Sequence, residues 1–349
     1  MARIITWLGG SERAAVVVAV ARWFAQRQRQ VLIVTHCPNP TLEAALGVTL
    51  TPEPQTVSPG IHAVQLQSVV LLEQFWEELK ALEARYLKFP FFRDVYGQEL
   101  GVLPGLDSLL TLNALRVYRQ DGQYDVILYD GASDRETLRM IGMPLLADWY
   151  YRRLSQVFAA SELSRNVAPL LGPLLGAVLA GGWEQQPWDQ PQAWLEDLLR
   201  QGQALVRNPQ ALTAYLVTDA QPAAVQLARW WWGSAQQVEV QVQGVLLTAG
   251  SPAAVAAAFA PLPVGTVTDL LDFDQVVPVP PPLVVDQAAR RIQLFLPGFQ
   301  KSQVKLTQYG PGLTVEAGDQ RRHIPLPPEW QGQGITSARF QEPYLTITF

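Results

Sequence analysis

A short glycine loop near the start of the chain contains residue types that can bind an anion. Residues 9–12 (GGSE) lie between an apolar run, residues 3–8, and an alanine- and valine-rich run that begins at Arg13. A strand, a glycine loop and a helix in this order direct free backbone N–H groups and the positive end of the helix dipole at a phosphate. An arginine at the start of the helix would supply a cation. The candidate phosphate-binding residues are Gly9, Gly10, Ser11 and Arg13.

The loop departs from the P-loop pattern G-x-x-x-x-G-K-[ST], in which a lysine contacts the β- and γ-phosphates and a hydroxyl binds Mg²⁺. When the two are aligned at the end of the pattern, Arg13 stands at the lysine, Ala14 at the hydroxyl and Glu12 at the preceding glycine. Alanine cannot bind a metal ion, and a glutamate beside phosphates would oppose binding by about 1–4 kcal/mol. The alternative is a plain strand-to-helix turn, for which Gly-Gly-Ser is equally suited.

The elements that must position this loop follow from the pattern of apolar residues. The expected strands are residues 3–8, 31–35, 124–129, 212–218 and 240–248. The expected helices are residues 13–26, 71–87, 106–118, 134–165 and 223–233. Strands and helices that alternate at this spacing predict an α/β domain with a mostly parallel sheet covered by helices.

A proline-rich stretch divides the chain. Residues 276–285 read VVPVPPPLVV, a composition that prefers an extended conformation and acts as a semi-rigid spacer. Beyond it, apolar residues recur with a period of two, as in residues 345–349 (LTITF), which predicts a small antiparallel β-sandwich. We therefore expect an α/β domain at residues 1–275, a linker at 276–288 and a β-sandwich at 289–349.

Composition narrows the choice of partners and cofactors. The net charge is −5 and the chain contains no cluster of basic residues, so we expect no nucleic-acid partner. Cys37 is the only cysteine and the three histidines are scattered, so we expect no zinc site. The N-terminus shows no signal-peptide pattern, so we expect a cytoplasmic protein. Residues 166–183 are uncharged, but Pro169 and Pro173 interrupt them, so we expect no transmembrane anchor.

Residues 124–139 (YDVILYDGASDRETLR) resemble a segment of the arsenite-pump ATPase family, YD-x-I-V-x-DTAPTGHTLR. This family includes the targeting factors for tail-anchored membrane proteins. Further similarity at residues 103–106 (LPGL), 143–144 (MP) and 149–150 (WY) extends the resemblance over about residues 1–275. The resemblance implies a P-loop-NTPase-like fold with a helical insertion, ATP or ADP as the ligand, and Asp130 as the carboxylate that helps to organise Mg²⁺ and water.

Several functional positions of that family are changed in this chain. Cys37 stands where the family has the aspartate that positions the attacking water, and residues 245–248 lack the asparagine that contacts adenine. The zinc-binding CxxC motif is absent as well. Without the metal ligand and the water-positioning group, hydrolysis loses most of its electrostatic help, so we expect weak or lost ATPase activity. Asp130 would then be a strand-end carboxylate that caps the next loop.

Two alternatives remain open at this point. In the first, the protein is an active ATPase with an unorthodox loop that uses Arg13 and Asp130. In the second, it is a structural or regulatory protein whose anion pocket holds a ligand that is not hydrolysed, or no ligand. Because the family's nucleotide sites meet across a twofold or pseudo-twofold axis, the resemblance is also compatible with a homodimer.

The C-terminal segment resembles a second family. Residues 294–299 (LFLPGF), 321–327 (RRHIPLP) and 335–347 are similar to the strands of an α-crystallin-type, or small heat-shock, domain. Some members of the pump-ATPase family carry such a domain, so the two resemblances support each other.

An apolar segment is a candidate binding surface for hydrophobic protein segments. In the tail-anchored targeting relatives, helices inserted after the aspartate segment form a groove for hydrophobic clients. At a roughly helical spacing, this chain has Leu170, Leu171, Leu174, Leu175, Val178 and Leu179. The alternative is ordinary packing in the protein core, which is the usual location of such residues.

Overall fold

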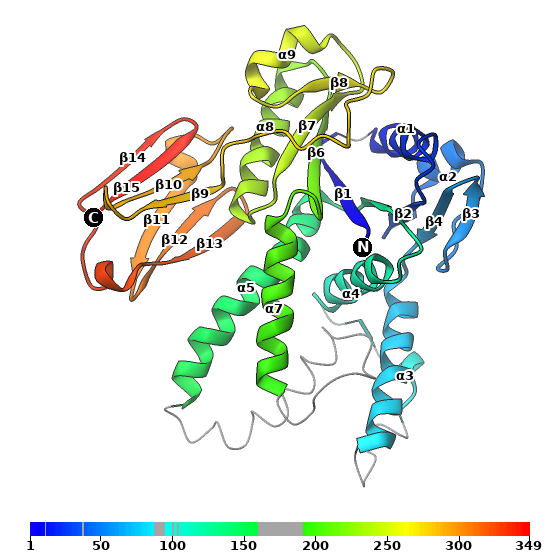
Figure 1. The fold of residues 1–349 in the computed structure, drawn as a ribbon, viewed down its shortest axis with the longest axis horizontal. Helices are drawn as coiled ribbons and strands as arrows, with labels where there is room; N and C mark the ends of the chain where they lie inside the picture. The colour runs from blue at the N-terminus through cyan, green and yellow to red at the C-terminus, as the bar shows by residue number, and fades with distance from the viewer. Residues whose placement is uncertain (11, 37, 87–94, 100, 103–104, 160–190) are drawn as a thin grey trace. The chain divides into compact units, whose positions relative to one another are not determined.

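The computed structural model describes residues 1–349 except 11, 37, 87–94, 100, 103–104 and 160–190 (Figure 1). An eight-stranded sheet has the strand order β3-β4-β2-β5-β1-β6-β7-β8. The chain divides into two compact units. The first contains residues 1–3, 24–127 and 143–204, and the second contains residues 4–23, 128–142 and 205–349. Among the described helices, none has the length and apolar character that a membrane span requires.

The first unit contains one end of the sheet and most of the long helices. Strand β2 (Val31–Thr35) pairs in parallel with β4 (Ile61–Gln65), and β3 (Gln55–Ser58) pairs with β4 in the antiparallel direction at the edge. All five residues of β2 are buried, as expected for a parallel strand covered on both faces. The helices of this unit are α2 (Pro40–Leu46), α3 (Ser68–Tyr86), α4 (Leu106–Gln120), most of α5 (Asp134–Ala159) and α7 (Pro191–Arg207).

The second unit contains the other end of the sheet. Strand β1 (Arg3–Leu8) pairs in parallel with β6 (Leu212–Thr218). Strands β7 (Val242–Leu247) and β8 (Val264–Thr266) continue the parallel arrangement. The unit also holds the end of β5 (Val126–Asp130), the start of α5, and helices α1 (Arg13–Ala25), α8 (Pro222–Gln237) and α9 (Pro252–Phe259).

Helix α1 follows the glycine loop and is apolar almost all round, which is typical of a helix buried against other elements. Ala14, Val16, Val17 and Val20 are at most 4% exposed. On the neighbouring part of the sheet, the ring of Trp7 on β1 lies 6.0 Å from the ring of Tyr215 on β6. These contacts fix the position of the loop that joins β1 to α1.

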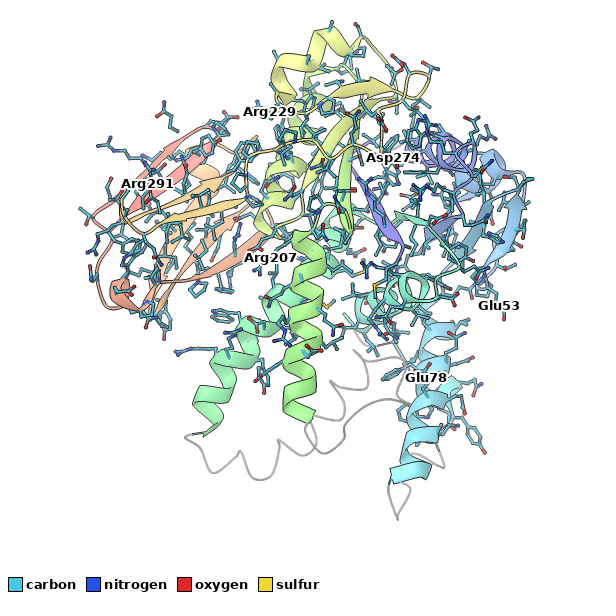
Figure 2. The ribbon with its side chains drawn as sticks, viewed as in Figure 1. Glu53, Glu78, Arg207, Arg229, Asp274 and Arg291 are labelled. Carbon is cyan, nitrogen blue, oxygen red and sulfur yellow. The ribbon has the colours of Figure 1, made fainter. Side chains whose placement is uncertain are left out.

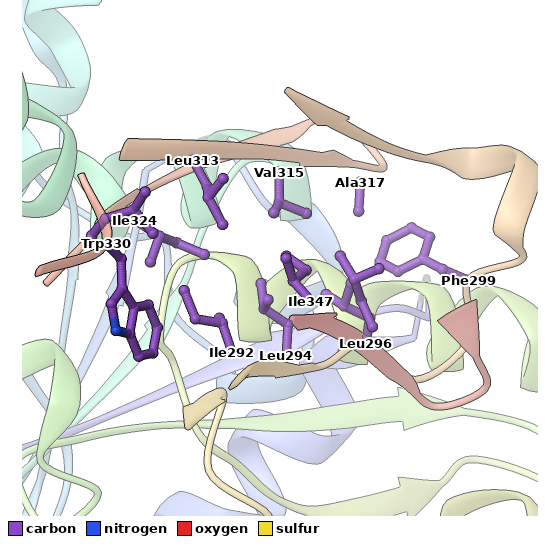
Figure 3. Packing of buried hydrophobic residues seen from close by; sticks show 12 residues of the cluster. Ile292, Leu294, Leu296, Phe299, Leu313, Val315, Ala317, Ile324, Trp330 and Ile347 are labelled. Atoms are coloured by element: carbon purple, nitrogen blue, oxygen red, sulfur yellow. The ribbon is translucent and has the colours of Figure 1, made fainter. Parts of the chain in front are cut away.

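The C-terminal part of the second unit is a sandwich of two antiparallel sheets. One sheet has the order β14-β15-β10-β9 and the other the order β11-β12-β13. Burial alternates along β12, as expected for a strand with one face toward a core. Side chains from both sheets meet in a common apolar core that includes Ile292, Leu294 and Val315 (Figure 3). The strands are β9 (Leu283–Asp286), β10 (Arg291–Phe295), β11 (Val304–Tyr309), β12 (Gly312–Ala317), β13 (Gln320–Pro325), β14 (Ser337–Gln341) and β15 (Tyr344–Thr348).

The sandwich packs directly on helix α8 of the same unit. A Cβ on Gly233 would lie 2.3 Å from the Pro297 carbonyl oxygen, so the helix and the sandwich approach more closely than any larger residue would allow. The ring of Trp232 stands 5.3 Å from that of Phe295, with the planes at 76°. At the surface of this contact, Arg229 pairs with Glu342 (Figure 2 labels Arg229).

The structure confirms the predicted fold class. A mostly parallel sheet with helices precedes an antiparallel sandwich, as the sequence periods indicated. The expected helix at residues 134–165 corresponds to α5, which is described as far as Ala159. The boundaries at residues 275 and 289 stay a prediction.

Candidate functional site

The glycine loop is held against the end of strand β6. Gly9 and Gly10 both have positive φ values, 81° and 57°, which glycine adopts without steric cost. A Cβ on Gly9 would lie 2.7 Å from the Val217 carbonyl oxygen, and one on Gly10 would lie 2.9 Å from Val217 Cγ1. Both the backbone conformation and the close approach therefore require glycine at these two positions. Ser11, the third predicted loop residue, lies outside the described residues.

Arg13 begins helix α1 and directs its guanidinium toward the end of strand β5. Its Nε atom lies 3.1 Å from Oδ1 of Asp130, and its Nη1 atom lies 2.6 Å from Oδ1 of Asp134. Its Nη2 atom donates a hydrogen bond of 3.0 Å to the Gly131 carbonyl oxygen. The Arg13 side chain is 16% exposed, so these are partly desolvated contacts. One cation thus faces two carboxylates.

Asp134 lies against the glycine loop and bonds to its backbone. Its Oδ2 atom accepts a hydrogen bond of 2.9 Å from the Gly9 backbone N–H. Its side chain is 14% exposed, and it lies in the first turn of α5, where the helix dipole favours a negative charge. Burial raises the pKa of Asp134, although Arg13 and the Gly9 N–H act in the opposite direction. The Asp134 carboxylate therefore accepts the hydrogen bond of a loop N–H and pairs with one nitrogen of the Arg13 guanidinium.

Asp130, the predicted Mg²⁺-organising carboxylate, lies at the end of β5 with 3% of its side chain exposed. In the structure it pairs with Arg13. Its role toward a metal ion stays a prediction. Ala14, at the position of the metal-binding hydroxyl, is buried and has no side-chain oxygen that could bind a metal ion. Over the part of the chain that the structure describes, no group of three or more His, Cys, Asp or Glu side chains could hold a metal ion.

A pocket of about 480 Å³ opens beside the loop. Every residue that lines it belongs to the second compact unit. The pocket receives residues from the loop and α1, the start of α5, helix α8 and the turn between β12 and β13. The lining residues are Gly10, Arg13, Ser133, Asp134, Arg135, Trp230, Trp231 and Asp319.

The structure brings together four of the predicted residues, Gly9, Gly10, Arg13 and Asp130. The candidate client-binding residues, from Leu170 to Leu179, lie outside the described residues, as does Cys37. Sequence reasoning noted Asp134 only as a departure from the family pattern and missed it as the partner of Arg13. A cation at the start of a buried helix requires a nearby anion, and that requirement was the available signal.

Strand β1 belongs to a mostly parallel sheet and is followed by a glycine loop and helix α1. This arrangement defines a protein with the fold of the P-loop NTPases. The model of the anion-transporting ATPase family matches residues 4–248, and that of an HSP20-like domain found in such ATPases matches residues 287–349. The chain therefore belongs to the anion-transporting ATPase family.

Curated relatives are similar over only part of their length. A candidate arsenical pump-driving ATPase of Chlorobaculum tepidum is 26% identical over 157 residues, which are 44% of this chain and 39% of that protein. An uncharacterized protein of Streptomyces coelicolor is 28% identical over 65% of this chain and 56% of its own length. A protein of Cryptosporidium parvum named as an ATPase ASNA1 homolog is 25% identical over 48% of this chain and 44% of its own length. The chain thus spans between 39% and 56% of these relatives.

Proposed function

We propose that this protein is a catalytically degenerate member of its family that acts as a binding or targeting module for hydrophobic protein segments. One observation carries the first half of the proposal. The Asp134 carboxylate bonds to the Gly9 N–H at 2.9 Å and to Arg13 at 2.6 Å, so the phosphate loop is occupied by the chain itself.

A nucleotide would have to compete with this internal carboxylate. To reach the Gly9 N–H, a phosphate must displace Asp134, and it then approaches Asp130 as well. Two carboxylates against one guanidinium give this part of the loop an excess negative charge when both are ionised. Like charges at contact distance near a protein surface repel by about 4 kcal/mol. Together with the alanine at position 14, this charge balance opposes binding of Mg²⁺-nucleotide at the loop.

The second half of the proposal concerns the client. Residues 166–183 are apolar and uncharged, and an HSP20-like domain follows the ATPase-like part of the chain. Both features favour recognition of exposed apolar segments over recognition of a polar ligand. The homodimer is part of the same proposal, because a groove shared by two copies would enclose a longer apolar helix.

Calorimetric titration with ATP and ADP, with and without Mg²⁺, tests the degenerate loop. We expect no Mg²⁺-dependent binding of ATP or ADP at millimolar concentration for the natural chain. The variant Asp134→Ala removes the competing carboxylate, so any gain of nucleotide or phosphate binding in it identifies Asp134 as the obstacle. Asp148→Ala, on the same helix α5, is the matched control. Binding that Mg²⁺ strengthens in the natural chain contradicts the proposal.

A fluorescent apolar helical peptide tests the client. Leu174→Asp places a charge in the candidate apolar surface and should weaken binding at least about tenfold, because a charge is excluded from an apolar contact. Ala177→Ser changes the same segment without adding a charge and should leave the affinity within about twofold. Equal binding by both variants would reject this segment as the client surface.

A second candidate function is an active ATPase, which the contact between Arg13 and Asp130 at the loop favours. In that case, Arg13→Ala abolishes nucleotide binding. Arg22→Ala, which removes an exposed arginine from the same helix, should leave binding unchanged. If nucleotide binds equally well to both variants, the hypothesis of an active ATPase that uses Arg13 is rejected.

A further inference from the structure

The pocket beside the loop has an aromatic wall. Trp230 and Trp231, on α8, are both half-buried, and their ring centroids lie 4.6 Å apart with the planes at 84°. Two indoles in an edge-to-face arrangement offer a rigid apolar surface, against which a planar group can pack with little loss of conformational entropy. The position of Trp230 is fixed from behind by Phe299, whose ring centroid is 5.8 Å away.

The turn between β12 and β13 forms another wall of the pocket. Gly318 in this turn has φ +61°, and a Cβ there would lie 2.8 Å from Trp230 Cζ2 and 3.1 Å from Ser234 Oγ. The turn is thus pressed against α8, and the next residue, Asp319, is placed at the pocket. The C-terminal sandwich therefore contributes directly to a site that the ATPase-like part alone would leave incomplete.

Charges at the rim of the pocket are unequal. Asp319 accepts a hydrogen bond of 2.8 Å from Arg139 Nη2, whereas Arg135 Nε stands 3.6 Å from the same carboxylate. A separation of 3.6 Å is an ion pair but is too long for a hydrogen bond. Two guanidinium groups share the Asp319 carboxylate, so this cluster has one positive charge in excess, and Arg135 is the arginine of the cluster that lines the pocket. The Arg135 side chain is 58% exposed, and its planar fork suits a carboxylate or a phosphate.

The floor of the pocket is different. There Arg13 faces both Asp130 and Asp134, so its guanidinium is already matched by carboxylates. An acidic ligand group gains nothing at the floor and gains an ion pair at the rim. The apolar part of such a ligand would lie along the two indoles. A volume of about 480 Å³ is within the range of sites that bind small molecules.

We propose that this pocket binds a small planar aromatic anion, with its ring on Trp230 and Trp231 and its acidic group on Arg135. Asp319 of the sandwich holds Arg135 in position without satisfying its donors. The proposal goes beyond the proposed function, because the ligand lies outside the occupied loop and needs neither Mg²⁺ nor a triphosphate. An aromatic carboxylate and a nucleoside monophosphate share this chemistry.

Two probes distinguish these sources in calorimetric titrations of the full chain. The probes are 2-naphthoate and adenosine monophosphate, and the neutral 2-naphthalenemethanol is the reference compound. We expect saturable binding of one or both anions at submillimolar concentration and at least about fivefold weaker binding of the neutral compound, because a charge-assisted hydrogen bond is lost. Arg135→Gln should weaken the anion by about tenfold or more. Arg152→Gln, an exposed arginine on the same helix, should leave the affinity unchanged.

Three results would overturn the proposal. They are no binding of either anion at millimolar concentration, equal affinity for the neutral compound, and anion binding that Arg135→Gln leaves intact. Trp231→Leu provides a second test of the wall, with circular dichroism to verify folding, and unchanged anion affinity in that variant also counts against the proposal. Mg²⁺-dependent ATP binding that survives Arg135→Gln would contradict the degenerate loop but not this site, so the two proposals fail separately.

Discussion

Replacing Arg13 by alanine tests the charge network at the glycine loop. Arg13 makes ion pairs of 3.1 Å and 2.6 Å with Asp130 and Asp134, whose side chains are 3% and 14% exposed. Removing one partner from a buried ion pair costs about 3–5 kcal/mol, because the other charge stays buried and unpaired. Asp134 keeps the Gly9 N–H as a donor, so part of its charge stays compensated. We therefore expect a loss near the lower limit, about 3 kcal/mol in the free energy of unfolding.

Chemical denaturation followed by far-UV circular dichroism measures this loss from the midpoint at constant slope. Arg22→Ala, an exposed position of the same helix, is the control and should change the free energy of unfolding by less than about 0.5 kcal/mol. The difference between Arg13→Ala and the natural chain should shrink as the pH falls, because burial raises the pKa of Asp134 and its protonation removes an unpaired charge.

The triple variant Arg13→Met, Asp130→Asn, Asp134→Asn removes the whole set of charges. It should recover much of the lost stability, because a neutral set leaves no buried charge without a partner. A loss in Arg13→Ala no larger than that of Arg22→Ala would refute the reasoning. So would a triple variant less stable than Arg13→Ala.

Two further predictions concern the contact between the sandwich and α8. Glu239 follows α8, and its Oε1 atom lies 2.6 Å from Nη2 of Arg322 on β13, while Arg207 pairs with the same carboxylate. Burial alone would raise the pKa of Glu239, but Arg322 and Arg207 outweigh it and lower the pKa. The contribution of Glu239 to stability is therefore present at neutral pH and lost as the pH falls from about 4.3 through the lowered value, so Glu239→Gln should flatten the acid limb of melting temperature against pH. Gly318→Ala should lower stability by about 2 kcal/mol through strain at φ +61° and a clash with Trp230, whereas Gly310→Ala, with φ +57° and open space around it, should cost only the strain. Thermal melts of the two glycine variants compare them directly, and equal losses would refute the close contact.

The sequence predicted most of the fold because its signals are local. The apolar runs that became β1, β2, β5, β6 and β7 have strand length, and the period of two after the proline-rich stretch indicated the sandwich. The close packing of the sandwich on α8 could not be predicted from these local patterns. It depends on Gly233 and Gly318, where a larger residue would clash with the facing element. The sequence does not say which element faces each glycine, so the requirement for glycine cannot be predicted from it.

The candidate site was predicted in part. The loop glycines and Arg13 were found because a strand–glycine–helix pattern is contiguous, and Asp130 was found through the family resemblance. The bond between Arg13 and Asp134 joins residues 121 positions apart, so no periodicity can predict it. Asp319 is farther still from the loop in sequence and arrives through the sandwich turn. Contacts between distant segments need the fold before they can be assigned.

The residues at the loop are consistent with one another when their charges are considered in turn. Asp130 is a buried carboxylate at a strand end, and burying an unpaired charge is costly. In a loop with neither a lysine nor a metal-binding hydroxyl, Arg13 supplies the cation that Asp130 requires. A guanidinium has more donors than one carboxylate can accept, and Asp134 and the Gly131 carbonyl oxygen take up the others. Asp134 then satisfies the Gly9 N–H, so this loop donor and the Arg13 guanidinium are both bonded to groups of the chain itself. A loop satisfied in this way has little free energy to gain from phosphate, which is why we assign binding of small ligands to the rim and the indoles, not to the loop.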